Sequence, residues 1–62
     1  MRGTILQIER ARRIAEQWGI SWGSENFSTL LLENGSLSVV WRRDSDSRWW
    51  QGWIDKTGRL ST

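Results

Sequence analysis

The sequence predicts an α+β domain in which an N-terminal helix packs on one face of an antiparallel β-meander of three or four strands. Two patterns lead to this prediction. Residues 4–18 repeat apolar side chains at the spacing of an amphipathic helix, whereas residues 27–54 carry β-branched and aromatic segments separated by turn sequences. Because the chain has only 62 residues, we treat residues 1–62 as one small domain.

The predicted helix has a start signal and a stop signal. Thr4 followed by Gln7 has the spacing of a capping box, and Gly19 followed by the apolar Ile20 is typical of a Schellman motif. We therefore place the helix at residues 4–18. The side that we expect to face the sheet carries Ile5, Ile8, Ala11, Ala15 and Trp18.

The Asn34-Gly35 pair predicts a two-residue type I′ turn between strands at about 27–33 and 36–43. The opposed pairs are then Leu32–Leu37, Leu30–Val39 and Ser28–Trp41. Since successive residues of a strand point to opposite faces, this register predicts an apolar inner face with Leu30, Leu32, Leu37, Val39 and Trp41. The outer face is mixed and carries Phe27, Thr29, Leu31, Val40 and Arg42.

A third strand is predicted at about 48–54, after the polar loop 44–47. With Arg43 opposite Arg48, the inner face receives Trp50, Gly52 and Ile54, and the outer face receives Trp49, Gln51 and Trp53. A shift of one residue would exchange these faces. Residues 55–58 read as a turn, and residues 59–61 as a short fourth strand.

The outer face is the predicted binding surface, because one helix covers only one side of the sheet. We expect Arg42 to lie opposite Trp49, where a cation–π contact is favoured. Trp and Arg are enriched at the energetic centres of protein interfaces. The candidate binding residues are Trp49, Trp53, Arg42, Gln51, Phe27, Leu31 and Val40. They indicate a small non-catalytic module for protein–protein interaction, including self-association as a homodimer.

Two other ligands fit the same surface. A sheet that presents Trp and Arg can stack bases and hold phosphates, and the nucleic-acid contacts would be Arg42, Arg43, Arg48 and Arg59. The net charge of only +2 and the apolar residues of the outer face favour a protein partner instead. Sugar stacking on the Trp rings is the third reading, with Gln51 as its one planar polar partner.

Residues 44–60 resemble the middle of an SH3 domain, in which an acidic loop precedes a Trp-Trp pair, a strand and a turn that contains Gly. The Ala-Leu-Tyr-Asp-Tyr-type opening of that family and its later Pro and Tyr are absent. We therefore interpret the likeness as a shared hairpin pattern and assign no peptide site from it. It leaves open the alternative that the sheet curls into a small barrel and buries both faces.

The composition argues against catalysis and cofactors. The chain has no His and no Cys, so the usual nucleophile–base pairs, zinc sites and disulfides are excluded. Asp44 and Asp46 are too few for a metal site, and we interpret them as a solvated turn. There is no apolar run long enough to span a bilayer and no signal-peptide pattern, so we expect a cytoplasmic protein without membrane contact.

Overall fold

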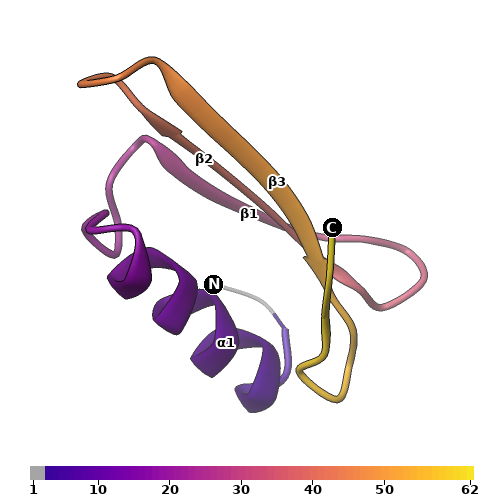
Figure 1. The fold of residues 1–62 in the computed structure, drawn as a ribbon. Coiled ribbons are helices and arrows are strands. Elements are labelled where there is room, and N and C mark those ends of the chain that lie inside the picture. Colours follow the sequence, from indigo (N-terminus) through magenta and orange to yellow (C-terminus); the bar gives the residue numbers. More distant parts are fainter. Residues whose placement is uncertain (1–2) are drawn as a thin grey trace.

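The computed structural model describes residues 3–62. In this part of the chain there are one helix and four strands: α1 (Ile5–Gln17), β1 (Phe27–Leu31), β2 (Leu37–Arg43), β3 (Arg48–Ile54) and β4 (Leu60–Ser61). The strands form one open antiparallel sheet in the order β1-β2-β3-β4, and α1 lies along one face of it (Figure 1). The predicted α+β fold is confirmed.

Both ends of α1 follow the sequence signals. The Thr4 hydroxyl accepts from the backbone N–H of Gln7 (3.2 Å), and the Gln7 side chain accepts from the N–H of Thr4 (2.9 Å), which completes the capping box. At the other end, Gly19 adopts φ 67°, and the N–H of Ile20 donates to the carbonyl of Ala15 (2.8 Å). This is the Schellman motif, in which a left-handed residue turns the chain out of the helix.

The predicted inner side of α1 is wrong at its N-terminal end. Gln7 is fully buried there, whereas Ile5 is 75% exposed. The reason is that the Gln7 amide does more than cap the helix, because its Nε2 donates to the carbonyls of Gly35 (2.8 Å) and Ile54 (2.9 Å). The helix is therefore rotated so that this amide meets the sheet. The other buried residues of α1 are Ala11, Ile14 and Ala15.

The predicted register of the first hairpin is also wrong, by one residue. Leu31, rather than Leu32, lies opposite Leu37. The connection has three residues, Glu33–Gly35: Gly35 has φ 87°, its N–H donates to the Leu32 carbonyl (3.0 Å), and the N–H of Leu32 donates to Ser36 (2.8 Å). Asn-Gly suits this type I turn with a left-handed glycine as well as a two-residue turn.

This one-residue shift exchanges the two faces of β1. Phe27 and Leu31, which the predicted register places on the outer face, belong to the inner one. Phe27 is only 8% exposed and packs on Trp22, with ring centroids 5.6 Å apart. Leu30 takes their place on the outer face. Burial of a phenyl ring in the core is the physical gain of the observed register, because the predicted register would have left it in water.

The register of the second hairpin is as predicted. Arg43 lies opposite Arg48, and Trp41 lies opposite Trp50. Like charges opposite each other are unfavourable in a sheet, and Asp46 relieves this contact by pairing with both arginines, at 2.8 Å and 3.6 Å. Consequently the residues of β3 keep their predicted faces.

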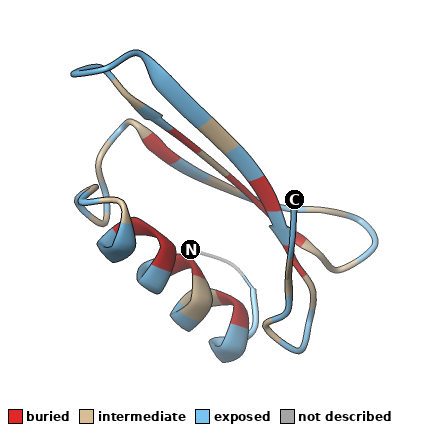
Figure 2. Ribbon diagram, viewed as in Figure 1, coloured by how far each residue is buried: buried red, intermediate tan, exposed pale blue. Residues whose placement is uncertain are grey.

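The core lies between α1 and the inner face, where Figure 2 shows the buried segments of helix and strands turned toward each other. The Trp50 ring, which is packed against this core, fills the space above Gly52. A Cβ at residue 52 would come within 2.7 Å of that ring. The sheet remains open, so the barrel alternative is wrong. The buried apolar residues are Ala11, Ile14, Ala15, Phe27, Leu37, Val39, Trp41 and Ile54.

Candidate binding surface

The outer face is the side of the sheet away from α1, and three cross-strand rows build it. The first runs Leu30–Ser38–Trp53, the second Ser28–Val40–Gln51, and the third passes from Asn26 through Arg42 to Trp49. The large residues therefore stand at the edges of the face and small or polar ones between them. Antiparallel pairing places these side chains within reach of one another.

Five of the seven candidate binding residues lie on this face. Trp49 is 69% exposed and Trp53 is 37% exposed, while Arg42 and Gln51 are exposed and Val40 is half-buried. The other two candidates, Phe27 and Leu31, are on the inner face because of the corrected register. Sequence reasoning missed Leu30, which is 65% exposed. Phe27 could have identified it. Burial of the Phe27 ring places the odd-numbered residues of β1 on the inner face and therefore leaves Leu30 on the outer face.

Two hollows border the Trp49 ring. One opens on the outer face, has a volume of about 390 Å³, and is lined by Glu25, Asn26, Ser28, Val40, Arg42 and Trp49. The second, of about 400 Å³, opens near the C-terminal end of α1 and is lined by Trp18, Trp41, Ser47, Arg48, Trp49 and Trp50. Trp49 is common to both, so a molecule that enters either hollow touches this ring.

The expected stacking of Arg42 on Trp49 is not what the structure shows. The two residues are directly opposed, but the Arg42 guanidinium pairs with Asp44, with Nε 3.4 Å from Oδ1. Asn26 donates to the other oxygen of the same carboxylate (3.3 Å). No cation among residues 3–62 thus stacks on the Trp49 ring, and the charge of Arg42 is balanced locally.

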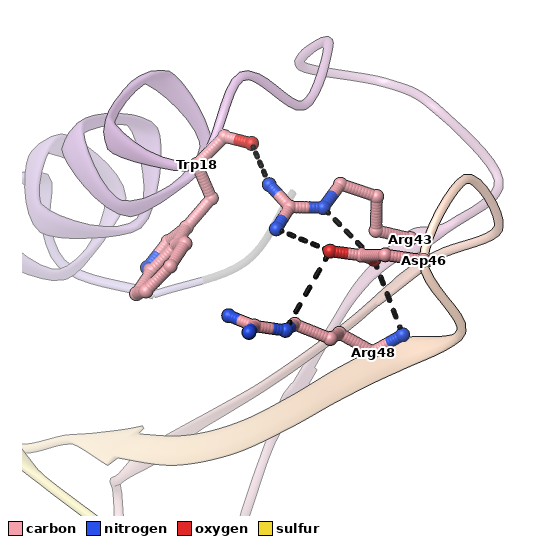
Figure 3. Close-up of polar contacts among 4 residues, drawn as sticks. All are labelled: Trp18, Arg43, Asp46 and Arg48. Carbon is pink, nitrogen blue, oxygen red and sulfur yellow. Dashed lines mark hydrogen bonds and ion pairs between the residues drawn. The ribbon is translucent and has the colours of Figure 1, made fainter.

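Arg43 and Arg48 converge on Asp46 beside the end of α1 (Figure 3). Arg43 donates to both carboxylate oxygens, at 3.2 Å and 2.8 Å, and its Nη1 donates to the carbonyl of Trp18 (3.3 Å). The hydrogen bond from Arg43 lowers the pKa of Asp46 below its ordinary value of 3.8. A cation at the C-terminal end of a helix also interacts favourably with the helix dipole.

The arginines predicted as nucleic-acid contacts therefore do not form one basic surface. Arg42, Arg43 and Arg48 lie at the same end of the sheet, where Asp44 and Asp46 pair with them. Arg59 lies at the opposite end, where its backbone N–H donates to Asp55 (3.0 Å).

Neither a metal cluster nor a membrane span is found in residues 3–62. No three His, Cys, Asp or Glu residues gather there in a way that could hold a metal ion. In the same part of the chain, the helix is too short and too polar to cross a bilayer.

Comparisons of the chain with protein-family models, with curated proteins and with solved structures give no match. The fold and the surface thus define the protein at the level of a class: a small α+β domain whose open sheet presents two exposed Trp rings.

Proposed function

We propose that this protein is a non-catalytic protein-binding module, and that a partner protein docks on the outer face around Trp49 and Trp53. The observation that carries the proposal is the exposure of these two rings on the same face. An aromatic side chain offers about 150–250 Å² of surface, so the two rings together expose on the order of 200 Å². Large apolar side chains that gather on one exposed face are often part of an interaction site.

The neighbours of the two rings favour a protein over a nucleic acid. Val40 and Gln51 between the rings offer apolar and neutral polar contacts, and the outer hollow beside Trp49 can receive a side chain. Binding to nucleic acid draws most of its affinity from cations that are free to contact phosphates. The cations at this end of the sheet are already paired with carboxylates. Enzymatic activity has no support in the chemistry of this face.

Capture experiments with matched variants test the proposal. Immobilised wild-type protein, Trp49→Ala, Trp53→Ala and Ile5→Ala would be incubated with nuclease-treated extract from the source cells. Ile5 is the control because it is a large apolar residue, 75% exposed, on α1 rather than on the sheet. We expect one protein to be retained by the wild type and by Ile5→Ala and lost with Trp49→Ala. Retention by all four proteins would contradict the outer face as the docking surface.

Titration with mixed-sequence DNA and RNA oligonucleotides at low salt tests the alternative. The electrostatic part of nucleic-acid binding is strongest under these conditions and decreases with salt. We expect no salt-dependent binding. Micromolar binding that weakens with salt and is reduced by Arg42→Ala would replace the proposed function with the nucleic-acid one.

A further inference from the structure

The hollow near the C-terminal end of α1 is lined mainly by tryptophan. The Trp41 ring is only 2% exposed, and the half-buried rings of Trp18 and Trp50 pack against it, with centroids 5.2 Å and 6.5 Å from its own. Pockets for small molecules usually have volumes of about 300–1,000 Å³ and a mostly apolar lining with a few polar groups. This hollow, of about 400 Å³, fits that description.

The arrangement of the rings favours a flat ligand. The planes of Trp41 and Trp50 are within 17° of each other, and Trp18 is tilted by 37° from Trp41. Cross-strand pairing opposite Trp41 holds Trp50 in place, and Trp18 is the C-cap residue of α1. Aromatic rings pack on one another in offset-stacked or edge-to-face arrangements. A planar aromatic molecule can therefore cover the ring surface that the fold leaves exposed.

Arg48 is the charged residue of this lining, and its guanidinium is available to a ligand. Arg43 is already engaged, because it donates to both oxygens of Asp46 and to the Trp18 carbonyl. The Arg48 side chain is 68% exposed, donates no hydrogen bond among residues 3–62 and approaches Asp46 through Nε at 3.6 Å. Its terminal nitrogens lie on the side of the Trp18 ring and are joined to none of the residues drawn in Figure 3.

The charges of this cluster favour a ligand with one negative charge. Arg43 and Arg48 carry two positive charges and Asp46 carries one negative charge, so one positive charge is left over. A carboxylate balances it and matches the planar fork of a guanidinium, with which it can form two parallel hydrogen bonds. A phosphate dianion would bring a second negative charge close to Asp46, with no cation to balance it.

We propose that this hollow binds a small planar aromatic carboxylate, with its ring against Trp18 and Trp50 and its carboxylate on Arg48. The site goes beyond the proposed function and does not depend on it. A partner on the outer face covers Trp53, which lines neither hollow, whereas the ligand enters from the side of α1.

Isothermal titration calorimetry with naphthoate, a flat bicyclic ring with one carboxylate, tests the site. We expect saturable binding with a Kd below about 1 mM. Two matched molecules separate the two contacts. Naphthamide keeps the flat ring without the charge, and cyclohexanecarboxylate keeps the charge without the flat ring. Each should bind at least about 10-fold more weakly, because each loses one of the two contacts.

Arg48→Gln tests the charged contact. We expect it to raise the Kd for naphthoate by about 10-fold and to leave the Kd for naphthamide unchanged, because only the first molecule has a carboxylate. Arg59→Gln is the matched control: Arg59 is also exposed but lies at the opposite end of the sheet, so both Kd values should stay unchanged. Circular dichroism would show that both variants keep the fold.

Nuclear magnetic resonance of the indole N–H groups locates the ligand. Naphthoate should shift the signals of Trp18 and Trp50, which line the hollow, and leave that of Trp53 unchanged. If the shifts centre on Trp53 instead, the molecule binds the outer face and the proposed site is wrong.

Two other results would overturn the site. One is the absence of saturable naphthoate binding at millimolar concentration. The other is an equal effect of Arg48→Gln on naphthoate and naphthamide, since the carboxylate would then make no contact with Arg48. Neither result bears on the capture of a partner protein, which is measured with the outer-face variants and without naphthoate. Conversely, failure of the capture experiment would leave naphthoate binding intact.

Discussion

At the N-terminal end of α1, the neutral amide of Gln7 is buried and donates to two carbonyls of the sheet. At the C-terminal end, the half-buried guanidinium of Arg43 donates to a helix carbonyl and to an exposed carboxylate. Both contacts hold the helix to a hairpin. Their energies should differ because hydrogen bonds shielded from water are costly to break, whereas surface ion pairs are screened by solvent.

Each of the two hairpin connections near these contacts also contains a turn residue with positive φ. Gly35 (φ 87°) is in the first connection and Ser47 (φ 57°) is in the second. Glycine adopts this conformation without a steric penalty, whereas a residue with a side chain pays for it in strain. The Gln7 end is thus buried and unstrained, and the Arg43 end is exposed and slightly strained.

The largest expected effect is that of Gln7→Leu. The leucine keeps a similar volume but leaves the carbonyls of Gly35 and Ile54 without donors, and we expect a loss of about 3 kcal/mol in the free energy of unfolding. Gln17→Leu is the control, because Gln17 is exposed on the same helix, and it should change stability by less than about 0.5 kcal/mol. Urea denaturation measures both. Equal effects would contradict a special role of the buried amide.

The next effect is that of Gly35→Ala, for which we expect a loss of about 1–2 kcal/mol. A β-carbon is disfavoured at φ 87° and would also meet the Lys56 side chain. Thermal denaturation should show the decrease. A stability equal to that of the wild type would contradict the left-handed conformation of Gly35.

Ser47→Gly should change stability in the opposite direction and by less. Removing the side chain from a left-handed position relieves strain, although glycine also gains entropy in the unfolded chain, so we expect a net gain of about 0.5 kcal/mol. The same urea experiment measures it, with Ser45→Gly as a control in the same turn. A loss for Ser47→Gly would show that the second connection is not strained.

The smallest effect belongs to the ion pair of Arg43 and Asp46, and it depends on pH. The pKa of Asp46 is lowered in the folded protein by its hydrogen bond with Arg43, so its contribution is present above about 3.8 and is lost as the pH falls through the folded pKa. Asp55 has a lowered pKa as well, through the hydroxyl of Thr57. Urea midpoints should therefore fall below pH 4. In Asp46→Asn the urea midpoint should fall less steeply below pH 4. A pH profile equal to that of the wild type would contradict the contribution of the pair.

The two hairpins show how far the sequence could predict this fold. For the second hairpin, the sequence left a shift of one residue open, and the structure has the register that we predicted, with Arg43 opposite Arg48. For the first, Asn34-Gly35 is compatible with turns of two lengths. The choice depends on contacts far along the chain, namely the stacking of Phe27 on Trp22 and the bond from Gln7 to the Gly35 carbonyl.

The same limit applies to the binding surface. Residues of β2 and β3 that we placed on the outer face are there, because their register was predicted correctly. The faces of Leu30 and Leu31 were exchanged together with β1, and the outer hollow beside Trp49 requires three strands to be in place before it exists. The sequence pattern of β2 and β3 predicted the face that carries Trp49 and Trp53. Contacts between residues far apart in the sequence determined which residues of β1 lie on that face.

The bonds of Gln7 also bear on the order of folding events. Its Nε2 joins residues separated by 28 and by 47 positions along the chain. Closing loops of this length is slow compared with forming a helical turn. An isolated helix as short as α1 is only marginally stable in water. The start of α1 should therefore become fixed only after β3 has joined the sheet, so that destabilising the second hairpin also slows the ordering of the first residues of the chain.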